Sequence, residues 1–195
     1  STVAPMFVII GNIMLMSVVL GYDTLSYARR GLFSGTVLYI FIFSLLTAAP
    51  FNAVLSRYMS DVIYEEKYDN ILSCYYLGLI LNVALSCLFG IPFCVWEYIA
   101  GGVHLLFVFT GFCGYIALVL VFYSMLYLSI CKDYQKISLY FLLGMVFAFL
   151  MSLFLVWGCH REIAYSMLLA LTCGFFLTAA LEAATIQRYF KKNSN

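Results

Sequence analysis

The sequence predicts an all-α, polytopic membrane protein with six transmembrane helices. Two observations carry this prediction. First, 65% of the 195 residues are hydrophobic and only 10% are charged, whereas an ordinary soluble domain has about 25% charged residues. Second, the few charged residues separate six long apolar blocks. A helix needs about 20 such residues to cross about 30 Å of hydrocarbon.

The six blocks follow one another along a single predicted transmembrane domain, residues 1–195. The first five contain no charged residue, and the sixth is long enough only because it runs on through Glu182 toward Arg188. A membrane barrel is excluded, because barrel strands alternate apolar and polar residues over about ten positions. The predicted spans are about residues 2–21, 32–56, 71–95, 102–129, 137–158 and 164–187.

The second span carries local signals at both of its ends. Gly31 and Gly35 have the small-xxx-small spacing that permits a close helix contact. Pro50 in the last turns favours a kink, because proline cannot donate a helical hydrogen bond. Short connectors further along the chain, such as 97–102 and 160–163, predict that consecutive helices are antiparallel neighbours.

The basic residues predict how the spans are oriented. With the N-terminus in the cytoplasm, seven Lys and Arg residues fall on inner segments and three, Arg29, Arg30 and Arg161, on outer ones. Since basic residues concentrate in cytoplasmic loops, both termini are expected to be cytoplasmic. Interfacial belts are expected to explain most of the aromatic residues at the span ends, among them Trp96 outside and Tyr127 inside.

Polar side chains inside the spans are candidates for a substrate pathway, because each is costly to place in a membrane and such groups are often functional. For the asparagines, the alternative is a hydrogen bond between helices, worth about 0.6 kcal/mol. Glu182 lies six residues before Arg188, about 9 Å deep at 1.5 Å per residue. It could extend to the inner headgroups, or it could couple transport to protons. The candidates are Asn12, Asn52, Asn82 and Glu182.

Other functional classes have little support in the residues. Motifs of metalloproteases, serine hydrolases and P-loop NTPases are absent, so no enzyme activity, cofactor or metal is expected. Seven cysteines lie mostly inside apolar blocks and form no CxxC pair, which favours small buried side chains over disulfides or metal ligands. The net charge of +1 and the lack of Lys/Arg runs give no reason to expect nucleic acid as a partner.

The most polar stretch, Ser56–Asn70 (SRYMSDVIYEEKYDN), is predicted to connect the second and third spans on the inner side. Its charge density is largely what any connector between two lipid-buried helices requires. If the helix continues into this stretch, Arg57 and Asp61 lie four residues apart on one face. Together with Tyr58, these two residues are candidates for a structural latch at the inner mouth of the domain.

The same stretch, RYMSDVIYEEKYDNIL from Arg57, is similar to the R-Y-x-S-D-x-x-Y segment of the PelG family. These proteins are inner-membrane exporters of Pel exopolysaccharide, grouped with the MOP flippases alongside MATE and Wzx proteins. Three further stretches agree in order: ARRGLFSGTVLYIF from Ala28, KDY at 132–134, and ISLYFLLGM, which contains Gly144.

The resemblance implies a fold of two six-helix lobes around a central cavity, of which this chain would be the N-terminal lobe. The chain opens STVAP without an initiator Met, so further residues are expected before Ser1. The implied location is the bacterial inner membrane, and the implied cargo is an amino-sugar polysaccharide. The implied partners are membrane lipid, a cytoplasmic glycosyltransferase and PelD- and PelE-like membrane proteins. Two alternatives stay open: a MOP-type carrier of a lipid-linked oligosaccharide or small cation, and a membrane scaffold for a polysaccharide synthase.

Overall fold

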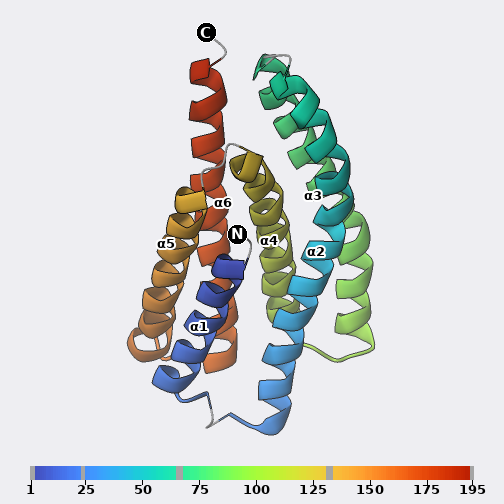
Figure 1. The fold of residues 1–195 in the computed structure, drawn as a ribbon. Helices are drawn as coiled ribbons and strands as arrows, with labels where there is room; N and C mark the ends of the chain where they lie inside the picture. The colour runs from blue at the N-terminus through green and yellow to red at the C-terminus, as the bar shows by residue number, and fades with distance from the viewer. Residues whose placement is uncertain (1–2, 23–24, 65–67, 131–133, 194–195) are drawn as a thin grey trace.

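The computed structural model describes residues 3–22, 25–64, 68–130 and 134–193, and these form helices joined by short turns, with no strand among them (Figure 1). The predicted all-α fold is therefore confirmed. The helices are α1 (Val3–Leu20), α2 (Tyr27–Tyr64), α3 (Tyr68–Ile99), α4 (Leu105–Ile130), α5 (Tyr134–Leu153) and α6 (Ile163–Asn193), and a π-helical turn, η2 (Phe154–Gly158), follows α5.

Five of these helices, α2 to α6, are long and apolar enough to cross a membrane, and α1 contributes a shorter apolar segment, Phe7–Leu20. Large apolar side chains lie exposed along the helices, for example Leu77, Phe89 and Leu150. Soluble proteins rarely expose so much apolar surface to water, whereas the lipid interior of a membrane can cover it. The chain is a multi-pass membrane protein, as the composition predicts.

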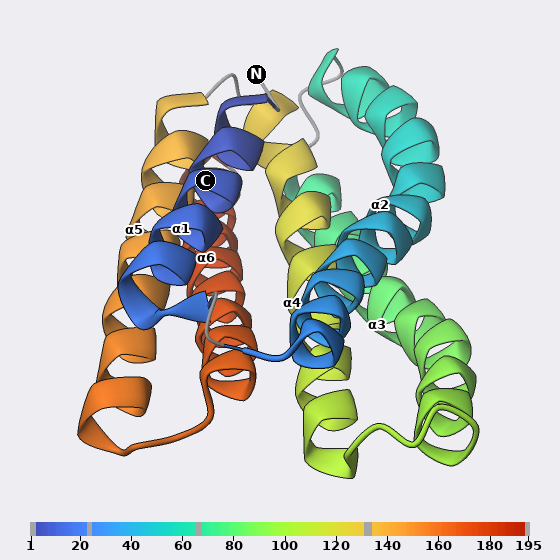
Figure 2. The ribbon, with the colours of Figure 1, turned by 90° about the horizontal axis from the view of Figure 1, so that it is seen from below.

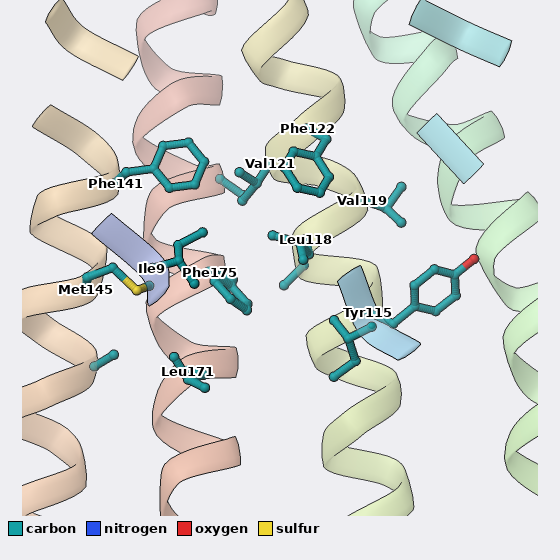
Figure 3. Close-up of a cluster of buried hydrophobic side chains, with 14 of the residues drawn as sticks. Ile9, Tyr115, Leu118, Val119, Val121, Phe122, Phe141, Met145, Leu171 and Phe175 are labelled. Atoms are coloured by element: carbon teal, nitrogen blue, oxygen red, sulfur yellow. The ribbon is translucent and has the colours of Figure 1, made fainter. Parts of the chain in front are cut away.

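The helices form two groups that share α4 (Figure 2). One group contains α1, α5 and α6, the other contains α2 and α3, and α4 lies between them and packs against α6. The shared core is built from apolar side chains of α1, α4, α5 and α6 (Figure 3), including Ile9, Leu118, Val121, Phe141, Met145, Leu171 and Phe175.

One expectation about packing is wrong. The first helix packs chiefly against α5, not against its neighbour in sequence, α2. The Asn12 side chain lies in this α1–α5 contact, where its Nδ2 is 3.5 Å from Met145 Sδ. Short connectors limit how far consecutive helices can separate, but α1 is apolar around its whole circumference. Its sequence therefore does not specify which face is buried or which neighbour covers it.

The GLFSG spacing permits a close helix contact, but the structure does not form one there. No atom lies within 4 Å of a Cβ built on Gly31 or Gly35. Instead, α5 and α6 meet at Gly144 and Gly174, where a Cβ on Gly144 would lie 2.7 Å from the Gly174 carbonyl oxygen. Glycine allows this approach because it has no side chain to separate the two backbones.

Helix α2 continues well beyond the predicted end of its span at residue 56. It has 38 residues and contains Pro50, and it changes direction along its length (Figure 1). At 1.5 Å per residue, the part from 57 to Tyr64 extends the helix by about 12 Å. Most of the polar stretch Ser56–Asn70 is thus helical, and residues 65–67 within it lie outside the description.

Candidate transport cavity and buried polar groups

A cavity of about 730 Å³ lies between α2, α3 and α4. Its walls are mainly apolar, and aromatic rings supply much of them. Tyr39 and Phe43 of α2 contact Phe93 of α3, with ring centroids 5.6 Å and 5.5 Å from it. The aromatic lining residues are Tyr39, Phe43, Phe89, Phe93, Phe107, Phe112 and Tyr115.

Small residues of α2 keep this cavity open. Gly31, Gly35 and Thr36 all line it, and the two glycines have free space where a side chain would stand. The GLFSG segment therefore contributes to the wall of a cavity and not to a helix–helix contact among the described residues. Volume that a larger side chain would occupy at Gly35 is available to a ligand.

A few polar groups interrupt the apolar lining. Thr47 Oγ1 of α2 and the Tyr115 hydroxyl of α4 are 2.6 Å apart and share a hydrogen bond. Figure 3 shows the Tyr115 ring extending from α4 away from the α6 side. Glu97, near the C-terminal end of α3, supplies a carboxylate. An apolar pocket with a few placed polar groups is the usual form of a small-molecule or cargo site.

Three predicted pathway residues have described side chains, namely Asn12, Asn82 and Glu182, and none of the three lines this cavity. Asn12 is half-buried between α1 and α5, and its Nδ2 donates weakly to the sulfur atoms of Met16 and Met145. Asn82 is buried on α3, and its Nδ2 donates to the Gly78 carbonyl oxygen at 2.7 Å, while its Oδ1 has no hydrogen-bond partner. Asn52 belongs to α2, but its side chain lies outside the description.

Glu182 is fully buried on α6 and does not reach toward the headgroups. Neither of its carboxyl oxygens has a hydrogen-bond partner, and it does not line the cavity. Its carboxyl group is within electrostatic range of the Tyr75 side chain on α3. The sequence left two interpretations of Glu182 open, extension to the inner headgroups or proton coupling. In this structure the side chain does not extend to the inner interface.

A buried cluster of hydroxyl groups between α3 and α4 was not predicted. The Tyr75 hydroxyl shares a hydrogen bond of 2.7 Å with Ser124 Oγ, and the Tyr123 and Tyr127 hydroxyls are 2.8 Å apart. The Tyr75 and Tyr127 rings meet edge to face at 4.8 Å. Tyr127 is completely buried, so its assignment to an interfacial belt is wrong. The i, i+4 spacing of Tyr123 and Tyr127 inside an apolar block was the available signal.

The proposed latch residues lie on the extended part of α2. Arg57 and Tyr58 are exposed. The backbone is helical from Arg57 to Asp61, so the four-residue spacing does place the two residues on one face. The Asp61 side chain lies outside the description, and an ion pair between Arg57 and Asp61 therefore stays a prediction.

No constellation for metal chemistry occurs in the part of the chain that the structure describes. No group of three His, Cys, Asp or Glu side chains there is placed to hold a metal ion. The six cysteines described are free thiols. His104 is exposed just before α4, and its Nδ1 accepts a hydrogen bond from the Leu106 backbone amide at 3.2 Å. It caps the helix start, which is a structural role.

The fold defines a polytopic, α-helical membrane protein with an apolar, aromatic-lined cavity between three of its helices. The sequence model of the PelG family, described as "Putative exopolysaccharide Exporter (EPS-E)", matches residues 1–195, the whole chain. The chain belongs to this family. No curated protein and no solved structure matches it.

Proposed function

We propose that this chain is part of a transporter that carries an exopolysaccharide across the bacterial inner membrane without making or breaking bonds in the cargo. The observation that carries the proposal is the aromatic-lined cavity of about 730 Å³ between membrane-spanning helices. Aromatic faces can pack against the apolar faces of sugar rings, and the Thr47–Tyr115 pair and Glu97 offer hydrogen bonds to hydroxyl or amino groups. Membership of an exporter family supports the same conclusion.

The mechanism we propose is alternating access, in which this helical bundle rocks against a second one around the cargo. The two groups of helices in Figure 2 meet mainly at α4, with further contacts from α3 and α2 to α6, and a change in the angle between the groups would act at this junction. The latch of Arg57 and Asp61 would then open and close at the inner mouth. The sites Asn12, Asn52, Asn82 and Glu182 would act in the pathway or in its coupling.

The orientation we propose has both termini in the cytoplasm. The start of α1 and the end of α6 point toward the same side of the bundle (Figure 1), which agrees with an even number of crossings. The excess of basic residues on that side supports the cytoplasmic assignment. The proposed partners on that side are a glycosyltransferase that makes the polymer and PelD- and PelE-like membrane proteins.

The apolar character of the cavity favours a second candidate function, transport of an oligosaccharide that carries a lipid tail. Phe89 and Phe93 of α3 line the cavity, and apolar walls of this kind could hold an acyl or prenyl chain. A naked polysaccharide would use mainly the polar groups and the ring faces. The two functions therefore differ in which lining residues are needed.

The test is deletion of the full-length gene in its own bacterium, followed by measurement of secreted and cell-associated polymer. We expect secreted polymer to disappear and to return when the gene is restored on a plasmid. Accumulation of a lipid-linked oligosaccharide in the membrane fraction would favour the second function. Normal polymer outside the deletion strain would contradict both transport functions. It would favour the scaffold interpretation only if the synthase lost its membrane association in the same strain.

A further inference from the structure

The Glu182 carboxyl group is the most costly polar group that the structure describes inside the helix bundle. The side chain is completely buried on α6, and both of its oxygens lack a hydrogen-bond partner. Burying an ionised carboxylate without a partner costs several kcal/mol or more, and such groups are accommodated by taking up a proton instead. Burial as the neutral acid costs far less. The geometry therefore requires Glu182 to hold a proton in this conformation.

Among the described residues, the elements packed against α6 have no buried Lys, Arg or His side chain that could replace this proton. Toward Glu182, α3 presents Tyr75. On α4, the titratable side chains at the depth of Tyr75 are Tyr123 and Tyr127. On α5, Tyr140 is hydrogen-bonded to Thr185, one turn beyond Glu182. Helix α2 has no titratable residue between Tyr39 and Arg57. The basic residues nearest in sequence on α5 and α6, Lys136 and Arg188, are exposed near the helix ends.

A proton fits this site better than a metal ion does. Hard metal cations take several oxygen ligands, typically six or more, whereas a proton needs one carboxylate oxygen. Glu182 is the only acid in its block of α6, and no metal-ligand group of three acidic, His or Cys side chains was found in the described part of the chain. The chemistry available is that of a single protonatable group.

The hydroxyl cluster of α3 and α4 lies toward the ends of these helices that we propose to face the cytoplasm. It begins at Tyr75, which is within electrostatic range of Glu182 and bonded to Ser124. It continues to Tyr127, three residues before the end of α4, whose hydroxyl lies 2.8 Å from that of Tyr123. Tyr75 and Ser124 form one hydroxyl pair and Tyr123 and Tyr127 a second, and ring contacts of Tyr75 hold the two pairs together. Hydroxyl groups both donate and accept hydrogen bonds, so a proton can step between the pairs when a hydroxyl rotates or a water molecule enters.

We propose that Glu182 is a proton-binding site that exchanges with the inner side through the Tyr75 hydroxyl cluster and couples proton movement to export. Binding adds one proton to one carboxylate oxygen and forms no other bond, and release returns that proton to water. The enclosed, unpartnered carboxyl of this conformation is assigned to the proton-bound form. The coupling part of this proposal rests on the proposed export function, whereas the proton-binding part does not.

The test uses infrared spectroscopy on the native full-length protein in liposomes. A protonated carboxylic acid gives a C=O stretching band that a carboxylate lacks. At neutral pH we expect such a band in the wild type, its complete loss in Glu182→Gln, and its retention in the matched control Glu162→Gln, since Glu162 is exposed before α6. Glu182→Asp keeps an acid and should keep a shifted band. Helicity measured by circular dichroism identifies any variant that does not fold.

Exchange is measured by following the band after a pH jump. We expect it to disappear reversibly at high pH in the wild type, and at least tenfold more slowly in Tyr75→Phe. Absence of the band, or a band that no accessible pH removes, would overturn the proposal. Coupling is measured as polymer secretion by cells carrying each variant. We expect loss in Glu182→Gln and partial retention in Glu182→Asp.

The two parts of the proposal can fail separately. Wild-type secretion from Glu182→Gln cells, together with a titrating band in the native protein, would overturn the coupling. If secretion depended on external Na⁺ and not on the proton gradient, the coupling of export to protons would likewise be overturned. If gene deletion itself left secretion intact, the export function would fail, while the infrared result on proton binding would stand independently.

Discussion

Gly144 of α5 and Gly174 of α6 bring two helix backbones into direct contact. A Cβ on Gly174 would lie 2.6 Å from the Gly144 carbonyl oxygen and 3.0 Å from the Ala148 Cβ. Both partners are parts of packed helices, so neither can yield without moving a whole element. This contact sets the distance between α5 and α6 at this point.

The first prediction concerns this contact. Gly144→Ala or Gly174→Ala should lower the free energy of unfolding by about 1–3 kcal/mol, because an added methyl group overpacks the interface. Gly11→Ala is the matched control, since Gly11 is also helical and has no atom within 4 Å of a built Cβ. It should gain about 0.5–1 kcal/mol from helix propensity. Unfolding by sodium dodecyl sulfate in mixed micelles, followed by circular dichroism, measures both. Equal stability of all three variants would contradict the close contact.

The second prediction tests the cavity. Gly35→Leu should fill part of the space between α2, α3 and α4 at little cost to folding, because nothing lies within 4 Å of the added Cβ. We expect polymer secretion to fall at least tenfold while helicity and unfolding are unchanged. Gly11→Leu, which is equally open but does not line the cavity, should secrete as the wild type does. Full secretion by Gly35→Leu would remove the cavity from the transport pathway.

The third prediction tests the latch on the extension of α2. Asp61→Asn should reduce secretion while changing the free energy of unfolding by only about 0.3 kcal/mol, the value of an exposed pair four residues apart. The charge exchange Arg57→Asp with Asp61→Arg should restore secretion, because it rebuilds the pair in the opposite order. Secretion assays on the two single variants and the double variant measure this. Asp61→Asn cells that fold the protein and secrete normally would reduce the stretch to a connector.

The fourth prediction concerns the turn after η2. His160 has a φ of 55°, in the left-handed region, which costs a residue with a Cβ roughly 1–2 kcal/mol. His160→Gly should therefore raise the free energy of unfolding by about 1 kcal/mol. The neighbouring Cys159 has a φ of −100°, so Cys159→Gly should lower stability by about 0.5–1 kcal/mol. Thermal unfolding of the two variants in one detergent distinguishes them, and a loss of stability in His160→Gly would show that its side chain is needed.

The sequence predicted the membrane class, the all-α fold and the approximate spans because these depend on apolar length, a property that each segment carries alone. It did not predict that α1 packs on α5, since a helix that is apolar on every face can be covered equally well by several neighbours. For the same reason the small-residue spacing of Gly31 and Gly35 showed only that a close contact was possible there. Those residues line a cavity, and the contact lies at Gly144 and Gly174.

The candidate site was likewise predictable from the sequence only in part. Sequence alone singled out Glu182, because a charge in an apolar block is visible without a structure, and it indicated the PelG family through short matching segments that the whole-chain match confirms. Only the tertiary structure placed Tyr75, Ser124 and Tyr127 together and showed that Glu182 is enclosed without a partner. The hydroxyl cluster and the unpartnered carboxyl group both depend on contacts between helices that are distant in sequence. The packing of those helices determines them, and no single apolar segment encodes that packing.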